Sequence, residues 1–223
     1  TRSLCDWSSD VCSSDLNVKA VELKDSYVEY KEKSRLLAKT GKVRFHHLNS
    51  FFSNVTNMSE EGNMLTAKVD ARFLDIYPVK TYWAFYLNNK RGRFDVSGHM
   101  GQGKAAAVSP VSVPLGGVRI DQGMIRSLDF DFRADNYSMG GKVKILYDDL
   151  KISMLRKDEK AMEKKKLASI GANLLVRNNN PSGNKPPRTG DAYFERDTTR
   201  SMLHMAWKTL MDGVGKSVLI THQ

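Results

Sequence analysis

The sequence predicts a mainly β protein: a curved antiparallel sheet followed by two C-terminal amphipathic helices. Apolar and polar residues alternate over most of the region 17–155, which is typical of half-buried strands. Clusters of Gly, Pro and Asn separate these alternating runs, as turns between strands require. After residue 155 the apolar spacing changes to three or four residues, which indicates helices.

Residues 1–16 are set aside before the fold is considered. The run DWSSDVCSSDL at 6–16 resembles the translation of a sequencing-library adapter, which indicates an artefact. Its Ser and Asp content predicts disorder. Both cysteines, Cys5 and Cys12, lie in this segment. The remaining 207 residues therefore hold no thiol for a disulfide, a zinc site or a nucleophile.

The balance of charge favours an anionic partner. The formal charge is +10 for the whole chain and +12 once the first sixteen residues are removed. The positive residues are dispersed, with one denser run at 164–166, and no known nucleic-acid-binding pattern accompanies them. We therefore predict no nucleic-acid partner. No stretch approaches the ~18 apolar residues of a membrane span.

The first half of the β region carries four alternating runs. Residues 18–30 read as strands around a turn at 24–26, and residues 42–52 place apolar and polar side chains on opposite faces. Residues 65–73 alternate strictly. Residues 79–87 carry aromatic side chains on both faces, so this strand is either buried on both sides or has an exposed apolar face.

The second half of the β region, 94–155, predicts further antiparallel strands. Residues 105–114 are small and contain proline, which favours a loop. At Asp148 and Asp149 the apolar set moves by one residue, so the register slips. A β-bulge explains this slip better than a cation site does, because adjacent strand residues face opposite sides and further ligands are lacking.

The C-terminal part, 156–223, is predicted to be a helical cap on the antiparallel β domain at 17–155. A first helix is expected at 157–176 and a linker rich in Pro, Gly and Asn at 178–190. Asp197 is the expected N-cap of the second helix. The apolar stripe of that helix comprises Met202, Leu203, Ala206, Trp207, Leu210 and Met211.

Several segments together resemble the C-terminal region of AsmA-like proteins, in the branch near AsmA and TamB. The most specific is GGKVKILYDDLKISM at 140–154. The others are FDVSGHMG at 94–101, VRIDQG at 118–123, the run 125–132, LLVRNNNP at 174–181, and ERDTTRSMLHMAWKTLMDGVGKSV at 195–218.

The resemblance implies a non-enzymatic protein of the Gram-negative envelope. Proteins of this family are thought to move phospholipid between membranes or to support outer-membrane assembly. The resemblance thus implies a periplasmic location, an inner-membrane anchor in a segment upstream of this sequence, and an acyl lipid or envelope proteins as partners. It implies no catalytic residue, no metal and no cofactor.

Periodicity alone leaves two architectures open. Two helices are too few to cover a large sheet, so an apolar face could remain as an open groove for acyl chains. In a β-sandwich, two inner faces would instead cover each other, and the protein would be a structural or interaction domain without lipid. The resemblance favours the groove. Its candidate lining residues are Leu128, Phe130, Phe132, Val143, Ile145 and Tyr147.

Overall fold

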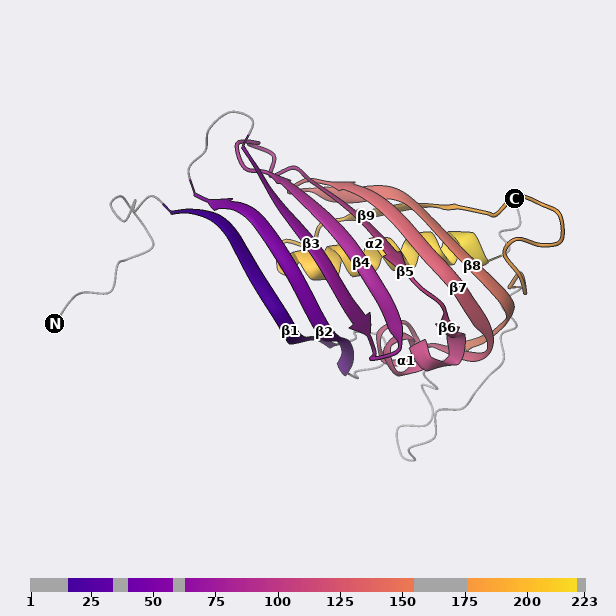
Figure 1. Ribbon diagram of the computed structural model, residues 1–223. Coiled ribbons are helices and arrows are strands. Elements are labelled where there is room, and N and C mark those ends of the chain that lie inside the picture. Colours follow the sequence, from indigo (N-terminus) through magenta and orange to yellow (C-terminus); the bar gives the residue numbers. More distant parts are fainter. Residues whose placement is uncertain (1–15, 34–39, 58–62, 155–175, 220–223) are drawn as a thin grey trace, which may run out of the picture.

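The chain forms one antiparallel sheet that remains open. The computed structural model describes residues 16–33, 40–57, 63–154 and 176–219. Within these residues nine strands follow the order β1-β2-β3-β4-β5-β7-β8-β9, with β6 paired to β7 (Figure 1). The predicted mainly β fold is confirmed, and because all strands belong to one sheet, the fold is not a β-sandwich.

Neighbouring long strands pair along most of their length. The strands are β1 (Asn17–Lys33), β2 (Thr40–Thr56), β3 (Met64–Phe73), β4 (Tyr77–Tyr86), β5 (Phe94–Met100), β6 (Gly103–Lys104), β7 (Val118–Ala134), β8 (Ser138–Met154) and β9 (Gly190–Glu195). The turn expected at 24–26 is wrong: β1 continues through it, with register shifts on both sides of Ser26. A bulge absorbs Asp25, whose φ is 43°.

Helix α2 (Met202–Val218) lies across one face of the sheet, behind the strands in Figure 1. We call this the inner face and the opposite one the outer face. A row of directly paired residues fixes the assignment, because paired side chains share a face. The row ends at Val143, which packs against Gly213 of α2. It comprises Leu23, Ser50, Val69, Thr81, Gly98, Phe130 and Val143.

The second predicted helix exists, but its N-cap and its buried side differ from the prediction. Ser201, and not Asp197, caps α2 by accepting a hydrogen bond from the His204 amide at 3.3 Å. The buried side comprises Met205, Thr209, Gly213 and Ser217, spaced four residues apart. These mostly small residues let α2 approach β9 closely, which hydropathy alone does not reveal.

The 105–114 segment, expected to be a loop, is helical instead. It forms the 3₁₀ helix η1 (Ala105–Val108) and continues into helix α1 (Ser109–Gly116), which begins with proline near its N-terminus. Ala105 and Val111 are fully buried, and Leu115 packs against Gly41 of β2. The small residues therefore allow η1 and α1 to pack closely between β2 and β7.

The bulge predicted at Asp148 and Asp149 is confirmed. Asp149 has a φ of 50°, and the β7–β8 register shifts between Gln122 and Met124, opposite this position. Asp148 forms an ion pair with Arg126 at 2.9 Å. Within the described residues no group of three or more acidic, His or Cys side chains is arranged to hold a metal.

The segment after 175 contains a strand that the sequence reading did not predict. Strand β9 pairs with β8 from Ser138 to Val143. Between Val176 and β9, the 178–190 linker is anchored by Asn180, which is fully buried. Its Nδ2 donates to the carbonyls of Ile145 at 2.6 Å and Arg188 at 3.0 Å. The helix expected at 157–176 lies almost wholly outside the described residues.

Candidate functional site

The six candidate groove residues lie together on the inner face, but they belong to the core. Leu128, Phe132, Val143, Ile145 and Tyr147 are at most 6% exposed. Phe130 is partly buried and stacks on Phe132 with ring centroids 5.0 Å apart. Helix α2 and the 176–190 segment pack on this part of the sheet, at Val143 and Tyr147 respectively. The surface that remains free must lie on other strands.

Tyr147 serves as an anchor for the segment that leads to β9. Its hydroxyl donates to the Arg177 carbonyl at 2.9 Å and accepts from Arg188 Nη2 at 3.2 Å. Burial raises the pKa of the phenol above its usual value, with Arg188 opposing the shift. The phenol therefore stays neutral and keeps its donor role.

We expect Tyr147→Phe to lower the free energy of unfolding by about 1–3 kcal/mol, because two hydrogen bonds are lost in a buried site. Urea unfolding measures this change. Tyr193→Phe is the matched control, since Tyr193 is 55% exposed and should leave stability unchanged. Equal stability of the two variants would show that the Tyr147 hydroxyl does not anchor the segment.

Apolar side chains remain exposed on the inner face at the opposite edge of the sheet. Leu23 and Val28 of β1 are 41% and 38% exposed. On α2, Leu203 is 45% exposed. Trp207, Leu210 and Val214 follow Leu203 at helical spacing, on the side of α2 next to its small buried residues, and they are partly buried and packed against the core. Two apolar surfaces, one from β1 and one from α2, thus remain incompletely covered.

A buried polar contact joins these two surfaces. His204 of α2 and Glu32 of β1 are 8% and 7% exposed, and Nδ1 lies 3.0 Å from Oε2. His204 Nδ1 makes no well-aligned hydrogen bond to a described residue. The Tyr30 hydroxyl donates to the same carboxylate oxygen at 3.4 Å. The end of β1, at one edge of the sheet, is therefore held against the N-terminal turn of α2.

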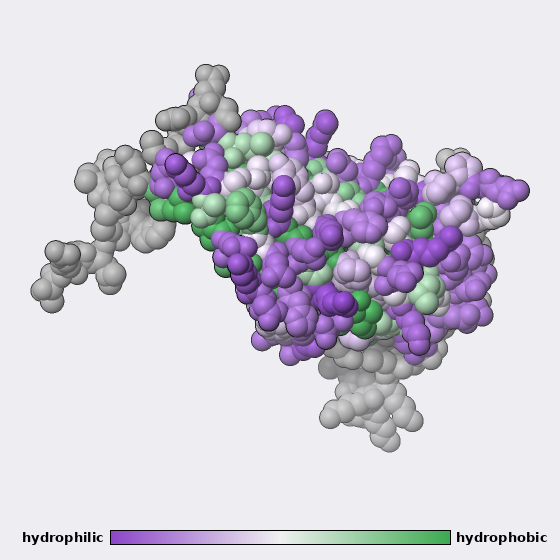
Figure 2. Space-filling view, viewed as in Figure 1, coloured by the Kyte–Doolittle hydropathy of each residue, from purple (hydrophilic) through white to green (hydrophobic). Residues whose placement is uncertain are grey.

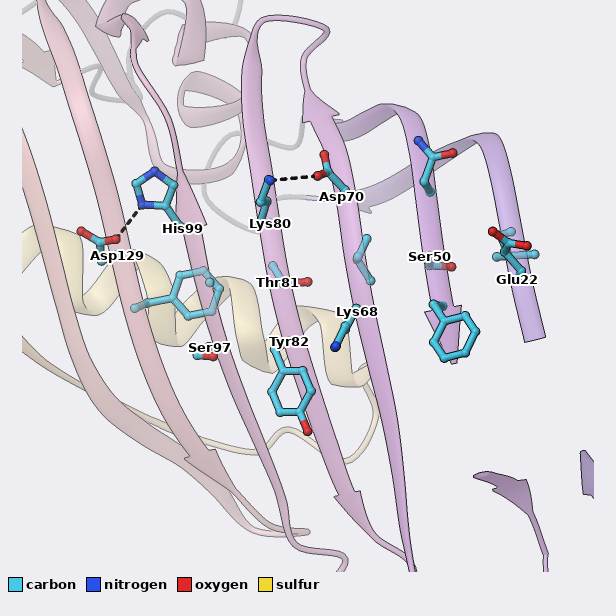
Figure 3. A pocket seen from close by; sticks show the side chains of 16 residues that line it. Glu22, Ser50, Lys68, Asp70, Lys80, Thr81, Tyr82, Ser97, His99 and Asp129 are labelled. Carbon is cyan, nitrogen blue, oxygen red and sulfur yellow. Dashed lines mark hydrogen bonds and ion pairs between the residues drawn. The ribbon is translucent and has the colours of Figure 1, made fainter. Parts of the chain in front are cut away.

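The outer face carries a shallow trough of about 670 Å³ that runs across β1 to β7 (Figure 3). Two rows of side chains form its walls. One row includes Phe51, Lys68 and Tyr82, which are cross-strand neighbours; Phe51 and Tyr82 are 48% and 39% exposed. The other row includes Asp70, Lys80, His99 and Asp129. The trough is thus aromatic on one side and ionic on the other.

The ionic wall is held by contacts across strands. Lys80 lies 3.4 Å from Asp70, and His99 Nδ1 lies 2.7 Å from Asp129 (Figure 3). Lys144 approaches the second oxygen of Asp129 at 3.6 Å. A His–Asp pair can orient a general base. Ser97 is on the same strand and face, but no hydrogen bond in the described part of the chain joins its hydroxyl to His99.

The outer face of the sheet is mainly polar. The face turned to the viewer in Figure 2 is largely hydrophilic, and its largest hydrophobic patch lies toward the N-terminal strands. Among the described residues, no helix combines the length and apolar character that a membrane crossing needs.

The sequence did not predict the exposed apolar residues of β1. Alternation shows which face of the sheet a residue lies on, but it does not show whether another segment packs on that face. Leu23 and Ile145 have the same periodicity signal, yet one is exposed and the other is buried under packed elements. No protein-family model, no curated protein and no solved structure matches this chain. The AsmA-like resemblance stays a prediction.

Proposed function

We propose that this protein is a non-enzymatic module of the bacterial periplasm that binds an acyl lipid on the inner face of its sheet. The observation that carries the proposal is the exposure of Leu23 and Val28 on β1, the edge strand whose end contacts the first turn of α2 through Glu32 and His204. Contiguous exposed apolar surface on a folded protein marks an interaction site. Acyl chains suit such a surface because the row of paired residues that crosses the inner face from Leu23 to Val143 contains no charged side chain.

The AsmA-like resemblance supports the same function, but the lining residues proposed here differ from those expected from the sequence. The β7–β8 residues are enclosed, so the lipid would contact Val21, Leu23, Val28 and Phe52 of β1 and β2. Val21 and Phe52 pair directly and are partly buried. Transport between membranes or support of outer-membrane assembly would follow from such binding.

The test is lipid occupancy of the purified chain. Native mass spectrometry and lipid extraction should reveal a co-purifying phospholipid. Leu23→Asp should lower its occupancy by at least about tenfold, because the contact area of one leucine is worth about 2 kcal/mol and a charge opposes acyl contact. The absence of lipid from the unmodified chain would contradict the proposal.

Phe51→Asp is the matched control. Phe51 lies on the neighbouring strand, has similar exposure and points to the outer face. It should leave lipid occupancy unchanged. Equal loss in both variants would show that the lipid contacts the sheet without regard to face.

A second candidate function is an interaction domain of the envelope that holds no lipid. The outer trough favours it, because Phe51 and Tyr82 are exposed on either side of Lys68, and Lys68 makes no ion pair within the described residues. Exposed aromatic residues are enriched in protein interfaces. A lipid-free chain that captures an envelope protein through Phe51 and Tyr82 would favour this function.

A further inference from the structure

A cluster of arginines forms a second, smaller hollow at one end of the sheet. The β4–β5 and β7–β8 connections lie side by side there, because Phe94 pairs with Ala134. The hollow has a volume of about 280 Å³. Its polar lining residues are Asn89, Arg91, Arg93, Arg133, Asp135 and Ser138.

The two connections are fixed to each other. The Asn136 amide donates to the Arg91 carbonyl at 2.8 Å. Asn89 Oδ1 accepts from the Arg91 amide at 3.0 Å, which shapes the first turn. In the second turn, Asp135 Oδ1 accepts from the amides of Tyr137 at 2.8 Å and Ser138 at 3.0 Å. The backbone that carries the arginines is therefore pre-organised.

The hollow has excess positive charge. Arg91 Nη2 lies 2.8 Å from Asp135 Oδ2. The hydrogen bonds from the Tyr137 and Ser138 amides, together with the charge of Arg91, lower the pKa of Asp135. Arg93 Nη2 lies 3.4 Å from Asp95, outside the hollow, and its guanidinium stacks 4.7 Å from the Tyr86 ring. Arg133 is exposed and makes no hydrogen bond or ion pair with another described residue. Three guanidiniums thus stand against two carboxylates, Asp135 in the lining and Asp95, which is the cross-strand neighbour of Arg133.

An exposed aromatic side chain lies beside these charges. Tyr137 is 68% exposed, and the Arg91 guanidinium lies 5.8 Å from its ring centroid. Tyrosine rings favour the level of lipid head groups, where one end is wet and the other apolar. Guanidinium groups match phosphate oxygens in geometry as well as charge. The combination suits a phosphate presented at a membrane surface better than a phosphate free in solution.

We propose that Arg91, Arg93 and Arg133 bind the phosphate of an anionic phospholipid head group while Tyr137 contacts the membrane interface. The proposal deepens the lipid-binding function and rests on it, because it names the group that the protein recognises and the end of the sheet that meets the membrane. It concerns docking to a membrane, whereas the inner face concerns the acyl chain.

The test is co-sedimentation of the full chain with vesicles of phosphatidylglycerol and phosphatidylcholine, compared with phosphatidylcholine alone. Binding should require phosphatidylglycerol, and Arg133→Ala should weaken it about fivefold, the effect expected for one basic residue near a lipid surface. Arg72→Ala is the control: Arg72 is exposed, has no ion pair among the described residues, and lies on β3 beside the β3–β4 turn. It removes the same charge and should change binding less than twofold.

Three outcomes would overturn the docking proposal: equal weakening by both variants, equal binding to both vesicle types, or binding of inorganic phosphate to Arg133 without vesicle binding. The proposed lipid occupancy is tested separately. Leu23→Asp should lose co-purified lipid yet keep vesicle binding. Loss of vesicle binding in Arg133→Ala with retained occupancy would support the two sites independently.

Discussion

Replacing Glu32 with alanine is expected to lower the free energy of unfolding by about 1–3 kcal/mol, the range for a buried polar group that loses its partner. His204 would be left 8% exposed, with its nearest carboxylate gone. Chemical denaturation measures the change. Hydrogen exchange should show the largest increase near the end of β1, because this contact joins it to α2. A loss below 1 kcal/mol would mean that packing alone holds the edge.

The double variant Glu32→Met/His204→Phe separates charge from packing. Replacing both partners of a buried polar contact by apolar groups of similar shape can be nearly neutral or stabilising. We therefore expect most of the stability lost in Glu32→Ala to be absent from the double variant. Phe194, whose ring lies 5.7 Å from His204 in an edge-on arrangement, provides an aromatic neighbour for the new side chain.

The Glu32–His204 contact also bears on the proposed function. It lies where the exposed surface of β1 meets α2, so the single variant should loosen the edge that borders the lipid. The double variant should restore that edge. Lipid occupancy measured on both variants would therefore separate loss of the edge from loss of a polar group.

The sequence predicted the sheet because alternation in a strand records which face is buried. Leu128, Phe130 and Phe132 share the inner face as expected, and the slip at Asp149 was visible as a change of parity. The open sheet was one of the two architectures left open. Its strand order was not predicted, because local periodicity contains no information about pairing partners.

The errors have a common physical cause: small and polar residues carry no hydropathy signal. Thr209, Gly213 and Ser217 form the side of α2 that packs most closely, although the larger Trp207 and Leu210 suggested the other side. Asn180, fully buried, looked like a linker residue until its hydrogen bonds were known. The candidate site could not be predicted for a related reason: an apolar residue is exposed or buried according to which distant segment packs on its face of the sheet.

The close approach of α2 to β9 should tolerate no added methyl group. A Cβ at Gly190 of β9 would overlap the carbonyl oxygen of Gly213 in α2. Because backbone atoms cannot rotate away as a side chain can, Gly190→Ala should cost at least about 3 kcal/mol, the upper end of typical overpacking. Thermal and urea unfolding would measure it.

Two glycines of α2 provide the controls for this prediction. Gly213→Ala should cost about 1–3 kcal/mol, the typical overpacking range, since its Cβ would meet Cγ2 and Cβ of the buried Val143. Gly215→Ala should instead stabilise the chain by about 0.5–1 kcal/mol, because alanine favours helix and the nearest atom, Leu219 Cδ1, lies 4.0 Å away. The expected loss of stability therefore decreases in the order Gly190, Gly213, Gly215, according to the atoms that each added methyl group meets. If all three substitutions stabilised the chain, helix and strand propensity would dominate, and α2 could not lie as close to β9 as the glycines allow.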